Sequence, residues 1–254
     1  MRLATWNVNS IRSRLESLTA WLADQQPDVV CLQELKVQDS EFPWAELETT
    51  GYHTAIVGQK TYNGVAVLAR QPLVVLRTGL QDDTDDPQAR LIDVQVADTR
   101  VISVYVPNGG ETTSDKYVYK LQWLQRLHSY LQRHCRPDER LCIGGDWNIA
   151  PEDIDVRNPG QWRETVLCTR EVRVAWRRLC DWGLIDAVRQ QYPDERLYSW
   201  WDYRNLGLQK NDGLRIDHWL VTAPIAAQVS AAGVDKTLRQ GDKPSDHAPV
   251  WIEL

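Results

Sequence analysis

The spacing of hydrophobic and polar positions predicts a strand, a helix and a second strand at the start of the chain. Residues 2–8 (RLATWNV) alternate closely enough for a strand, and apolar residues then recur at helical spacing from Ile11 to Leu22. Ser10 stands where an N-cap would begin that helix. The compact apolar run at 28–32 (DVVCL) indicates a buried strand.

Short alternating segments dominate the middle of the chain. A short helix is expected over 42–50, and short strands are expected at 52–57, 64–69, 73–78, 90–96 and 100–106. Several strands at such close spacing favour antiparallel sheet over a doubly wound parallel sheet.

Longer helices appear in the second half. Their apolar spacing predicts helices from Tyr117 to Leu131 and over 170–182, the second closed by Gly183 as a C-cap. The arginines of the second helix could face phosphates or form a solvated face. A strand ended by a glycine pair is expected over 141–145, and an irregular stretch over 156–167. Two further strands are expected over 214–221 and 249–254.

Length and cysteine content limit the class of protein. The chain has 254 residues and no Pro-, Ser- or Gly-rich linker, so a single domain over 1–254 is expected. Its five cysteines are odd in number and lack C-x-x-C spacing, which disfavours zinc and a secreted disulfide framework. No apolar run is long enough to span a bilayer and no signal sequence precedes the first strand. These features predict a soluble cytoplasmic protein.

Charge adds little to this picture. A net charge of −6 neither supports nor excludes a nucleic-acid partner, because basic residues can gather on one face. Four aspartates lie within 81–87 (QDDTDDP), where neither Gly nor Glu falls as a calcium loop requires, so a solvated acidic loop is expected. Twelve tryptophans against one phenylalanine supply aromatic faces that should mostly be buried.

Polar residues lie at or just after the ends of several predicted strands. They are Asn7, Glu34, Tyr105, Asn108, Asp146 and Asn148. An acid and an amide two residues apart, such as Asp146 and Asn148, point the same way from an extended chain and could hold a water and the oxygen that it attacks. The alternative is a strand followed by an Asx turn, since both are common turn residues.

An aspartate within the apolar strand at 214–221 needs a partner. Asp217 would be costly there unless it were paired, and His247, next to Asp246 at the start of the last strand, is the candidate. Such a pair can be purely structural or part of a catalytic site.

Seven stretches in order resemble one known family. They are TWNVNSIRSR (5–14), LQELK (32–36), YVPNG (105–109), GDWNIAP (145–151), SWWDYR (199–204), RID (215–217) and SDHAP (245–249). The chain resembles, over essentially its whole length, the exonuclease III family of DNA-repair nucleases within the endonuclease/exonuclease/phosphatase superfamily. This resemblance implies an α/β fold, a four-layered sandwich of two mixed, mostly antiparallel sheets packed face to face with helices outside.

The resemblance also implies one catalytic cleft at the top of the sandwich. Asp146 would accept the proton of the attacking water, Asn148 would orient that water or the phosphate, and His247, held by Asp217, would bind the phosphate. Tyr105 and Asn108 would add phosphate contacts. Carboxylate and amide oxygens suit Mg²⁺, with Mn²⁺ as a substitute, and the expected ligands are Glu34, Asn7 and Asp246. One ion and two ions are both compatible with these residues.

The implied substrate is double-stranded DNA, cut 5′ to an abasic sugar or trimmed at its 3′ ends. A sugar pocket is expected from Trp200, Leu214 and Ile216, where Leu214 departs from the tryptophan of many relatives and leaves the balance of activities open. DNA contacts are expected from Arg12, Arg14, Lys36, Lys60, Arg90, Arg204, Lys210, Arg215 and Lys243. The protein is expected to act as a monomer and not to bind a membrane. No protein partner can be inferred.

Two other functions remain possible at this point. The first is a superfamily phosphatase that acts on a phosphoester outside nucleic acid. The second is a relative that binds DNA without cutting it.

Overall fold

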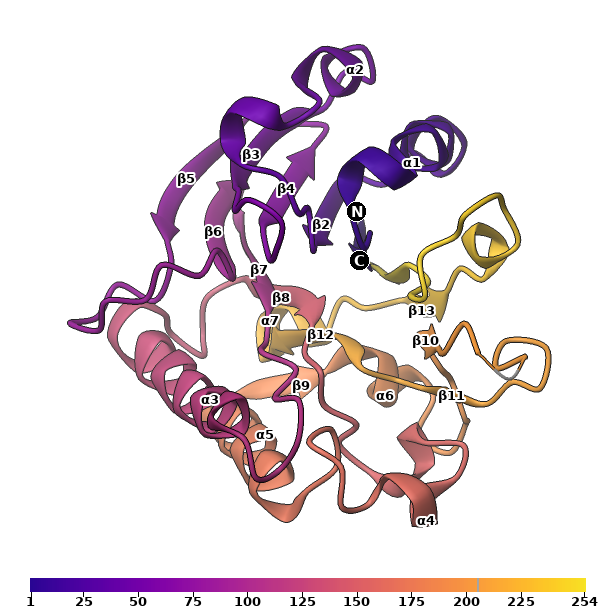
Figure 1. Cartoon of the computed structure of the whole chain (residues 1–254). Coiled ribbons are helices and arrows are strands. Elements are labelled where there is room, and N and C mark those ends of the chain that lie inside the picture. The colour runs from indigo at the N-terminus through magenta and orange to yellow at the C-terminus, as the bar shows by residue number, and fades with distance from the viewer. Residues whose placement is uncertain (205) are drawn as a thin grey trace.

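Two six-stranded sheets pack face to face and carry helices on their outer faces. The computed structural model describes residues 1–204 and 206–254. In Figure 1, α1 and α2 lie outside one sheet, while α3 and α5 run side by side outside the other. The expected four-layered α/β sandwich is therefore confirmed.

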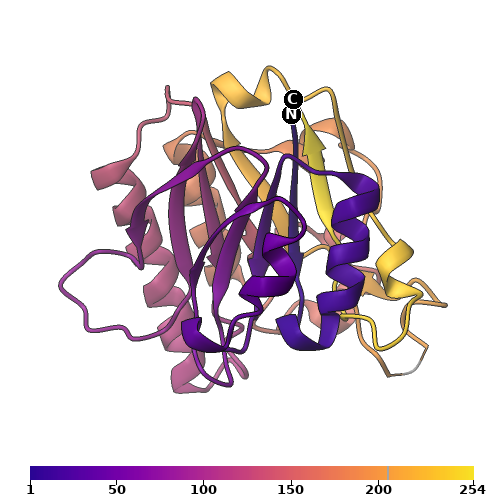
Figure 2. The ribbon, with the colours of Figure 1, turned by 90° about the horizontal axis from the view of Figure 1, so that it is seen from above.

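The first sheet has the strand order β13-β14-β1-β2-β4-β3. Its strands are β1 (Arg2–Asn7), β2 (Val29–Gln33), β3 (His53–Val57), β4 (Val65–Ala69), β13 (Ala231–Val234) and β14 (Val250–Glu253). Only β1 and β2 run parallel, and the other pairs are antiparallel. The two termini lie together, as Figure 2 shows, because β1 pairs with β14 and the terminal ammonium of Met1 donates to the Leu254 carbonyl over 2.9 Å.

The second sheet has the order β5-β6-β7-β8-β12-β9. Its strands are β5 (Leu73–Thr78), β6 (Leu91–Val96), β7 (Thr99–Tyr105), β8 (Leu141–Asp146), β9 (Leu184–Asp186) and β12 (Asp217–Thr222). A separate short hairpin pairs β10 (Trp200–Trp201) with β11 (Gly213–Leu214).

Helices connect and cover these strands. The α-helices are α1 (Ile11–Gln25), α2 (Trp44–Glu48), α3 (Asp115–His134), α4 (Pro159–Trp162), α5 (Arg170–Trp182), α6 (Ala187–Gln191) and α7 (Ala223–Ala226). Short 3₁₀ turns are η1 (Asp39–Glu41), η2 (Asp153–Asp155) and η3 (Thr237–Arg239). Ser114 and Thr169 cap α3 and α5 through their side chains, and Gly183 ends α5 in the left-handed region as predicted. Within the described residues, no helix combines the length and apolarity that a membrane crossing needs.

Two parallel strand pairs fix the position of the site. In β1–α1–β2 and in β7–α3–β8 the helix returns the chain so that both strands end at the same edge of their sheet. The two pairs face each other across the sandwich, where β1 contacts β8 and β2 contacts β7. Polar residues at the carboxyl ends of all four strands therefore meet.

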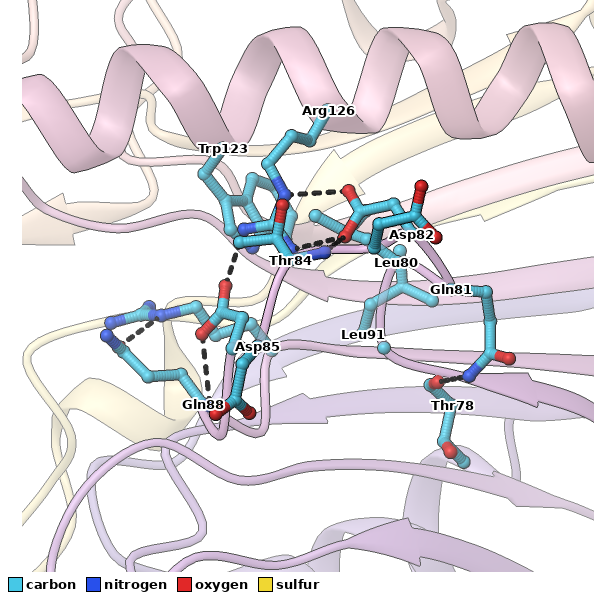
Figure 3. A pocket seen from close by; sticks show the side chains of 14 residues that line it. Thr78, Leu80, Gln81, Asp82, Thr84, Asp85, Gln88, Leu91, Trp123 and Arg126 are labelled. Carbon is cyan, nitrogen blue, oxygen red and sulfur yellow. Dashed lines mark hydrogen bonds and ion pairs between the residues drawn. The ribbon is translucent and has the colours of Figure 1, made fainter.

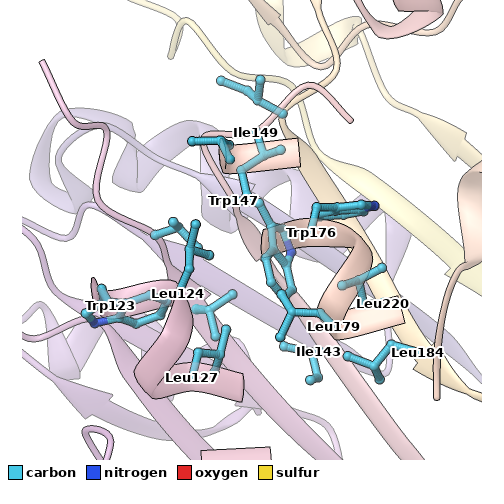
Figure 4. Close-up of a cluster of buried hydrophobic side chains, with 14 of the residues drawn as sticks. Trp123, Leu124, Leu127, Ile143, Trp147, Ile149, Trp176, Leu179, Leu184 and Leu220 are labelled. Atoms are coloured by element: carbon cyan, nitrogen blue, oxygen red, sulfur yellow. The ribbon is translucent and has the colours of Figure 1, made fainter. Parts of the chain in front are cut away.

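Aromatic packing fills the space between the second sheet and its helices. Figure 4 shows Trp147 lying against Trp176 of α5, and their ring centroids are 5.4 Å apart in an edge-to-face arrangement. Seven of the twelve tryptophans are buried, which confirms their expected place in the core.

The glycine pair lies inside a strand and does not end it. Gly144 and Gly145 are residues of β8, which continues to Asp146. A Cβ on Gly144 would come within 2.5 Å of the Trp219 indole, and one on Gly145 would meet the backbone of Val104. The glycines are therefore needed for close packing in the middle of the sandwich.

Three local predictions were also wrong. The expected strand at 214–221 is interrupted, because the Arg215 amide donates to the Asp155 carbonyl, so Asp217 begins β12 instead of lying in the middle of a strand. The stretch 156–167 contains α4. Ser10 precedes α1 but makes no capping hydrogen bond with its side chain.

The acidic loop is more ordered than a solvated run would be. Arg126 of α3 reaches over it, with Nε 2.7 Å from Asp82 (Figure 3). Its Nη1 lies 2.7 Å from Asp86. Two of its four aspartates are thus ion-paired, whereas Asp83 and Asp85 are exposed.

Candidate active site

Asp146 occupies the centre of the cluster at the strand ends. As the last residue of β8 it is only 1 % exposed. Its Oδ2 accepts a hydrogen bond of 2.9 Å from the Asn7 side-chain amide, and the amide group of Asn148 lies 3.3 Å from the same oxygen. A buried carboxylate with amide donors is held in one orientation.

Asn148 forms an Asx turn and also places its side chain at Asp146. Its backbone N–H donates to Asp146 Oδ1 over 2.9 Å, and its φ of 48° lies in the left-handed region that Asn tolerates, so an Asx turn is present. The chain is therefore not extended here, yet the turn still brings the Asn148 side chain to Asp146. Asn108 donates to Asn148 Oδ1 over 2.9 Å, which joins the loop after β7 to the same cluster.

His247 lies beside the same oxygen of Asp146. Its Nε2 lies 3.8 Å from Asp146 Oδ2, while its Nδ1 donates to Asp217 over 2.9 Å. Asp217 is fully buried and also accepts a 2.6 Å hydrogen bond from the Ser199 hydroxyl, so it has the partner that its burial requires.

Burial and charge shift the two facing groups toward useful protonation states. Burial raises the pKa of Asp146, and the Asp217 carboxylate raises it further, although the His247 imidazolium opposes both. Burial alone would lower the pKa of His247, but the carboxylates of Asp217 and Asp146 outweigh it and raise the pKa above its usual value. The site therefore favours an imidazolium beside a carboxylate that can accept a proton near neutral pH.

Glu34 lies next to Asp146 through a shared donor. The amide NH₂ group of Asn7 donates over 2.9 Å to Glu34 Oε1 and over 2.9 Å to Asp146 Oδ2. The Tyr105 hydroxyl donates to Glu34 over 2.9 Å, and Lys36 Nζ lies 2.9 Å from its other oxygen. Burial would raise the pKa of Glu34, but the Asn7 hydrogen bond and the Lys36 ammonium lower it below its ordinary value, so Glu34 is ionised.

Asn7 and Asp246, the other two expected metal ligands, differ in their hydrogen bonds. The Asn7 carbonyl oxygen accepts from the Asn9 backbone N–H, and its NH₂ group faces the carboxylates and positions them. That oxygen keeps one lone pair, and a role of Asn7 as a metal ligand stays a prediction. Each oxygen of Asp246 accepts one hydrogen bond, from Asn9 over 3.0 Å and from the Trp200 indole over 2.9 Å, and each retains a free lone pair.

The donor set can accommodate a hard cation. Asp146, Asp217 and His247 bring ligand atoms within 4.8 Å of one another, a grouping that could hold a metal ion. Asp217 already accepts hydrogen bonds from His247 and Ser199, so a cation bound there would compete with these donors. Glu34, ionised and partly exposed, is better placed to bind a hard cation.

Arg215 is a correction to the expected DNA surface. Its side chain is 1 % exposed, with Nε 2.7 Å from Asp155 and Nη1 2.8 Å from Asp186. A guanidinium buried between two carboxylates holds the loop before β12 in place and cannot reach a phosphate of bound DNA.

The other basic residues differ in exposure. Arg12 and Arg204 are exposed, as are Lys60, Lys210 and Lys243. Arg14 donates to the carbonyls of Asn9 and Pro244 and so ties two site loops together. Arg90 is largely buried, with its guanidinium stacked on the Tyr105 ring at 4.7 Å.

The three expected sugar-pocket residues are only partly accessible. Leu214 and Ile216 are 1 % and 3 % exposed, so they could supply no more than the floor of a pocket. Trp200 is half-buried and packs edge-on against Trp162 of α4, with ring centroids 6.0 Å apart. Trp162 was not expected here, because its segment looked irregular.

Two polar residues of the site were also missed. Asn9 connects Lys36 to Asp246, and Ser199 supports Asp217. Both lie within the family motifs, so the motifs themselves contained the signal.

Comparison with known proteins agrees with this geometry. The model of the Endonuclease/Exonuclease/phosphatase family matches residues 4–247. Exodeoxyribonuclease III of Haemophilus influenzae is 37 % identical, with all of both chains covered. An AP endonuclease from Archaeoglobus fulgidus superimposes with a TM-score of 0.97 at 39 % identity, covering 100 % of this chain and 99 % of that one.

A third relative was solved with nucleic acid. The 3′ phosphatase NExo from Neisseria, bound to a product DNA hairpin, superimposes with a TM-score of 0.96 at 42 % identity, and 100 % of this chain and 99 % of that one are covered. Full-length similarity at these identities shows the family directly. The chain belongs to the exonuclease III family of nucleases, within the endonuclease/exonuclease/phosphatase family.

Proposed function

We propose that the chain hydrolyses phosphodiester bonds of double-stranded DNA, cutting 5′ to abasic sites and removing nucleotides or phosphate from 3′ ends. The observation that carries this proposal is the arrangement around Asp146. A proton-accepting carboxylate and an imidazolium face each other across 3.8 Å, and the side-chain amides of Asn7 and Asn148 hold the carboxylate. In-line attack by water on a phosphate needs such a base for the water and such a cation beside the phosphoryl oxygens.

In the proposed reaction, Asp146 accepts the proton of the attacking water. Asn7 and Asn148 hold its carboxylate in place, and Asn148 also orients the water or the phosphate. His247 donates a hydrogen bond from Nε2 to a phosphoryl oxygen, while Asp217 keeps the ring oriented and charged. Charge that develops on the phosphate is thereby stabilised by a group that is already positioned.

Tyr105 and Asn108 complete the phosphate contacts. Burial and the Glu34 carboxylate raise the pKa of Tyr105 well above its ordinary value, so the hydroxyl stays protonated. Its one O–H donates to Glu34 and would turn to the phosphate when the substrate binds. Asn108 is exposed and bonded to Asn148, which places its amide at the edge of the same site.

We assign Mg²⁺ as the cofactor and Mn²⁺ as its substitute. Glu34 would bind the ion, with Asp246 as a second carboxylate, and the ion would neutralise charge on the phosphate when bound. Carboxylate oxygens are ligands that these hard cations prefer. Calorimetric titration with Mg²⁺ measures the number of ions that bind.

The proposed substrate is bound through its backbone. Exposed Arg12, Arg204 and Lys210 would contact phosphates and give affinity that falls as salt rises. The described helices include none arranged as a recognition helix, so the lesion would be found through DNA shape, where a nucleotide without a partner base is the least costly to turn out. We expect a monomer.

We also propose that the protein acts in the cytoplasm. All five cysteines are free thiols, and four of them are buried. A reducing compartment would keep them in this state.

One purified sample on three substrates tests the function. A duplex with one abasic site, a recessed 3′ end and a nick with a 3′ phosphate should each be processed in the presence of Mg²⁺. Activity only on an inositol phosphate or another small phosphoester would replace the nuclease proposal with a phosphatase. DNA binding without turnover on any arm would leave a binding protein.

A further inference from the structure

Lys120 is a charged side chain buried beneath the active-site loops. It lies on α3, is 0 % exposed, and has no carboxylate among its hydrogen-bond partners. Its Nζ instead donates to three backbone carbonyls, those of Asn108 over 3.1 Å, Asn148 over 2.6 Å and Val166 over 2.7 Å. An ammonium has three N–H groups, so each is used.

The three carbonyls belong to three separate segments. Asn108 follows β7, Asn148 follows β8, and Val166 lies between α4 and α5. Among the described residues, no other donor reaches these carbonyls. Lys120 is therefore the common attachment point of loops that are far apart in sequence.

Packing around the lysine supports the same conclusion. A Cβ on Gly109, whose φ is 101°, would lie 3.1 Å from Lys120 Cδ and 3.2 Å from Val166 Cβ. The loop that carries Asn108 thus rests directly on the lysine stem. Burial lowers the pKa of Lys120 to about 7, although the Asp146 carboxylate opposes this shift.

We infer that Lys120 is a positioning residue that sets the Asn108–Asn148 pair at the phosphate site by fixing the backbone of both residues. This inference rests on the proposed function. Lys120 does not touch the substrate. It acts through the 2.9 Å hydrogen bond from Asn108 to Asn148, which forms only if the two loops keep their separation.

Loss of the Lys120 ammonium should slow the chemical step more than it weakens DNA binding. Without the ammonium, three buried carbonyls lose their donor and the loops must shift to find water or other partners. A displacement of about 1 Å at catalytic groups can cost about 100-fold in rate. DNA affinity, which depends on the exposed basic residues, should change little.

Two variants of Lys120 and one remote control form the test. Lys120→Met keeps the length of the side chain and removes all donors, whereas Lys120→Arg keeps the charge and the donors. Asp93→Asn weakens another buried network, with Arg100 and Tyr130, toward the opposite end of β7 from Tyr105. It perturbs a buried network without touching the site loops, and urea denaturation compares its stability with that of Lys120→Met.

We expect Lys120→Met to lower kcat on the abasic duplex by about 10- to 100-fold, with KM changed by less than about threefold. Lys120→Arg should recover part of kcat, and Asp93→Asn should keep it. Hydrogen exchange should increase together at 107–110, 147–150 and 165–168 in Lys120→Met, and in Lys120→Arg to a smaller extent. The exchange measurement needs no activity, so it tests the inference even if the wild type fails to cut DNA.

Three results would overturn the inference. They are a Lys120→Met protein with unchanged kcat, unchanged exchange in the three loops, or an equal loss of kcat in Asp93→Asn at matched stability. If Lys120→Met does not fold, Lys120→Gln, which is shorter and has one N–H donor fewer, carries the same test, and wild-type exchange and kcat in that variant would contradict the role. Failure of the wild type on every DNA substrate would count against the proposed function alone.

Discussion

His247 Nε2 lies 3.8 Å from Asp146 Oδ2, and within the described residues no side chain hydrogen-bonds to that imidazole nitrogen. Each group shifts the pKa of the other, since the imidazolium lowers that of Asp146 and the carboxylate raises that of His247. A phosphoryl oxygen beside this pair would accept a hydrogen bond from His247, and Asp146 would serve as the base for the attacking water. The predictions below follow from this relationship.

Activity should have a bell-shaped dependence on pH. Asp146 must be ionised, so activity is lost as pH falls through its raised pKa, above the usual range of a carboxyl group. His247 must be protonated, so activity is lost as pH rises through its own raised pKa. Asp217→Asn removes the largest favourable charge beside His247 and should move the alkaline limb to lower pH, with kcat about 10- to 100-fold lower. A pH profile of kcat/KM measures this, and an alkaline limb that stays in place would show that His247 does not titrate there.

Removal of the Asn7 amide, which donates to both Glu34 and Asp146, should shift the acidic limb of the pH profile. Asn7→Ala deletes the amide that donates to both Glu34 and Asp146. Because that hydrogen bond lowers the pKa of Asp146, its loss should move the acidic limb to higher pH and lower kcat at neutral pH by about 10-fold or more. Asn9→Ala is the matched control on the neighbouring loop, and it should leave the acidic limb unchanged.

The metal assignment can be tested without DNA. Glu34→Gln removes an ionised carboxylate that faces the cleft, so calorimetric binding of Mg²⁺ or Mn²⁺ alone should weaken by about 10-fold or more. Asp83→Asn, an exposed acid in the loop at 81–87, should bind the ion like the wild type. Equal affinity in Glu34→Gln and the wild type would move the ion elsewhere, with the grouping of Asp146, Asp217 and His247 as the next candidate.

Arg215 should affect stability and not DNA affinity. Arg215→Met leaves Asp155 and Asp186 buried with one cation fewer, which should cost about 3–5 kcal/mol of unfolding free energy. Urea denaturation measures this loss. Arg12→Met, at an exposed position, should leave stability unchanged and reduce the salt dependence of DNA binding by about one charge. The reverse pattern would mean that Arg215 contacts DNA after all.

The hydrophobic period predicted the individual elements well because it is a local signal, and the resemblance to the family implied the four-layered sandwich. The strand at 73–78 and the helix at 170–182 match the structure to the residue. The glycine pair at 144–145 was misread because its role depends on Trp219 and Val104, which come from other strands. The strand at 214–221 was drawn too long because the interruption at Arg215 depends on Asp155, which is distant in sequence.

The site was predicted as a set of residues and not as a set of contacts. The motifs identified the acids, amides and histidine that converge, but the direction of each hydrogen bond depends on neighbours. The Asn7 amide faces the carboxylates because the Asn9 backbone takes its oxygen. Lys120 could not be recognised, because a lysine in an amphipathic helix usually faces water and only the tertiary structure buries it.

The central claim is that Asp146 performs chemistry at a site that DNA can bind without it. The most direct measurement is single-turnover cleavage of a duplex with one abasic site in Mg²⁺, for the wild type and Asp146→Asn, with DNA affinity measured on the same samples. We predict that Asp146→Asn binds the duplex within about threefold of the wild type and cleaves it about 100- to 10,000-fold more slowly. Cleavage by Asp146→Asn within tenfold of the wild-type rate at equal DNA occupancy would contradict the account.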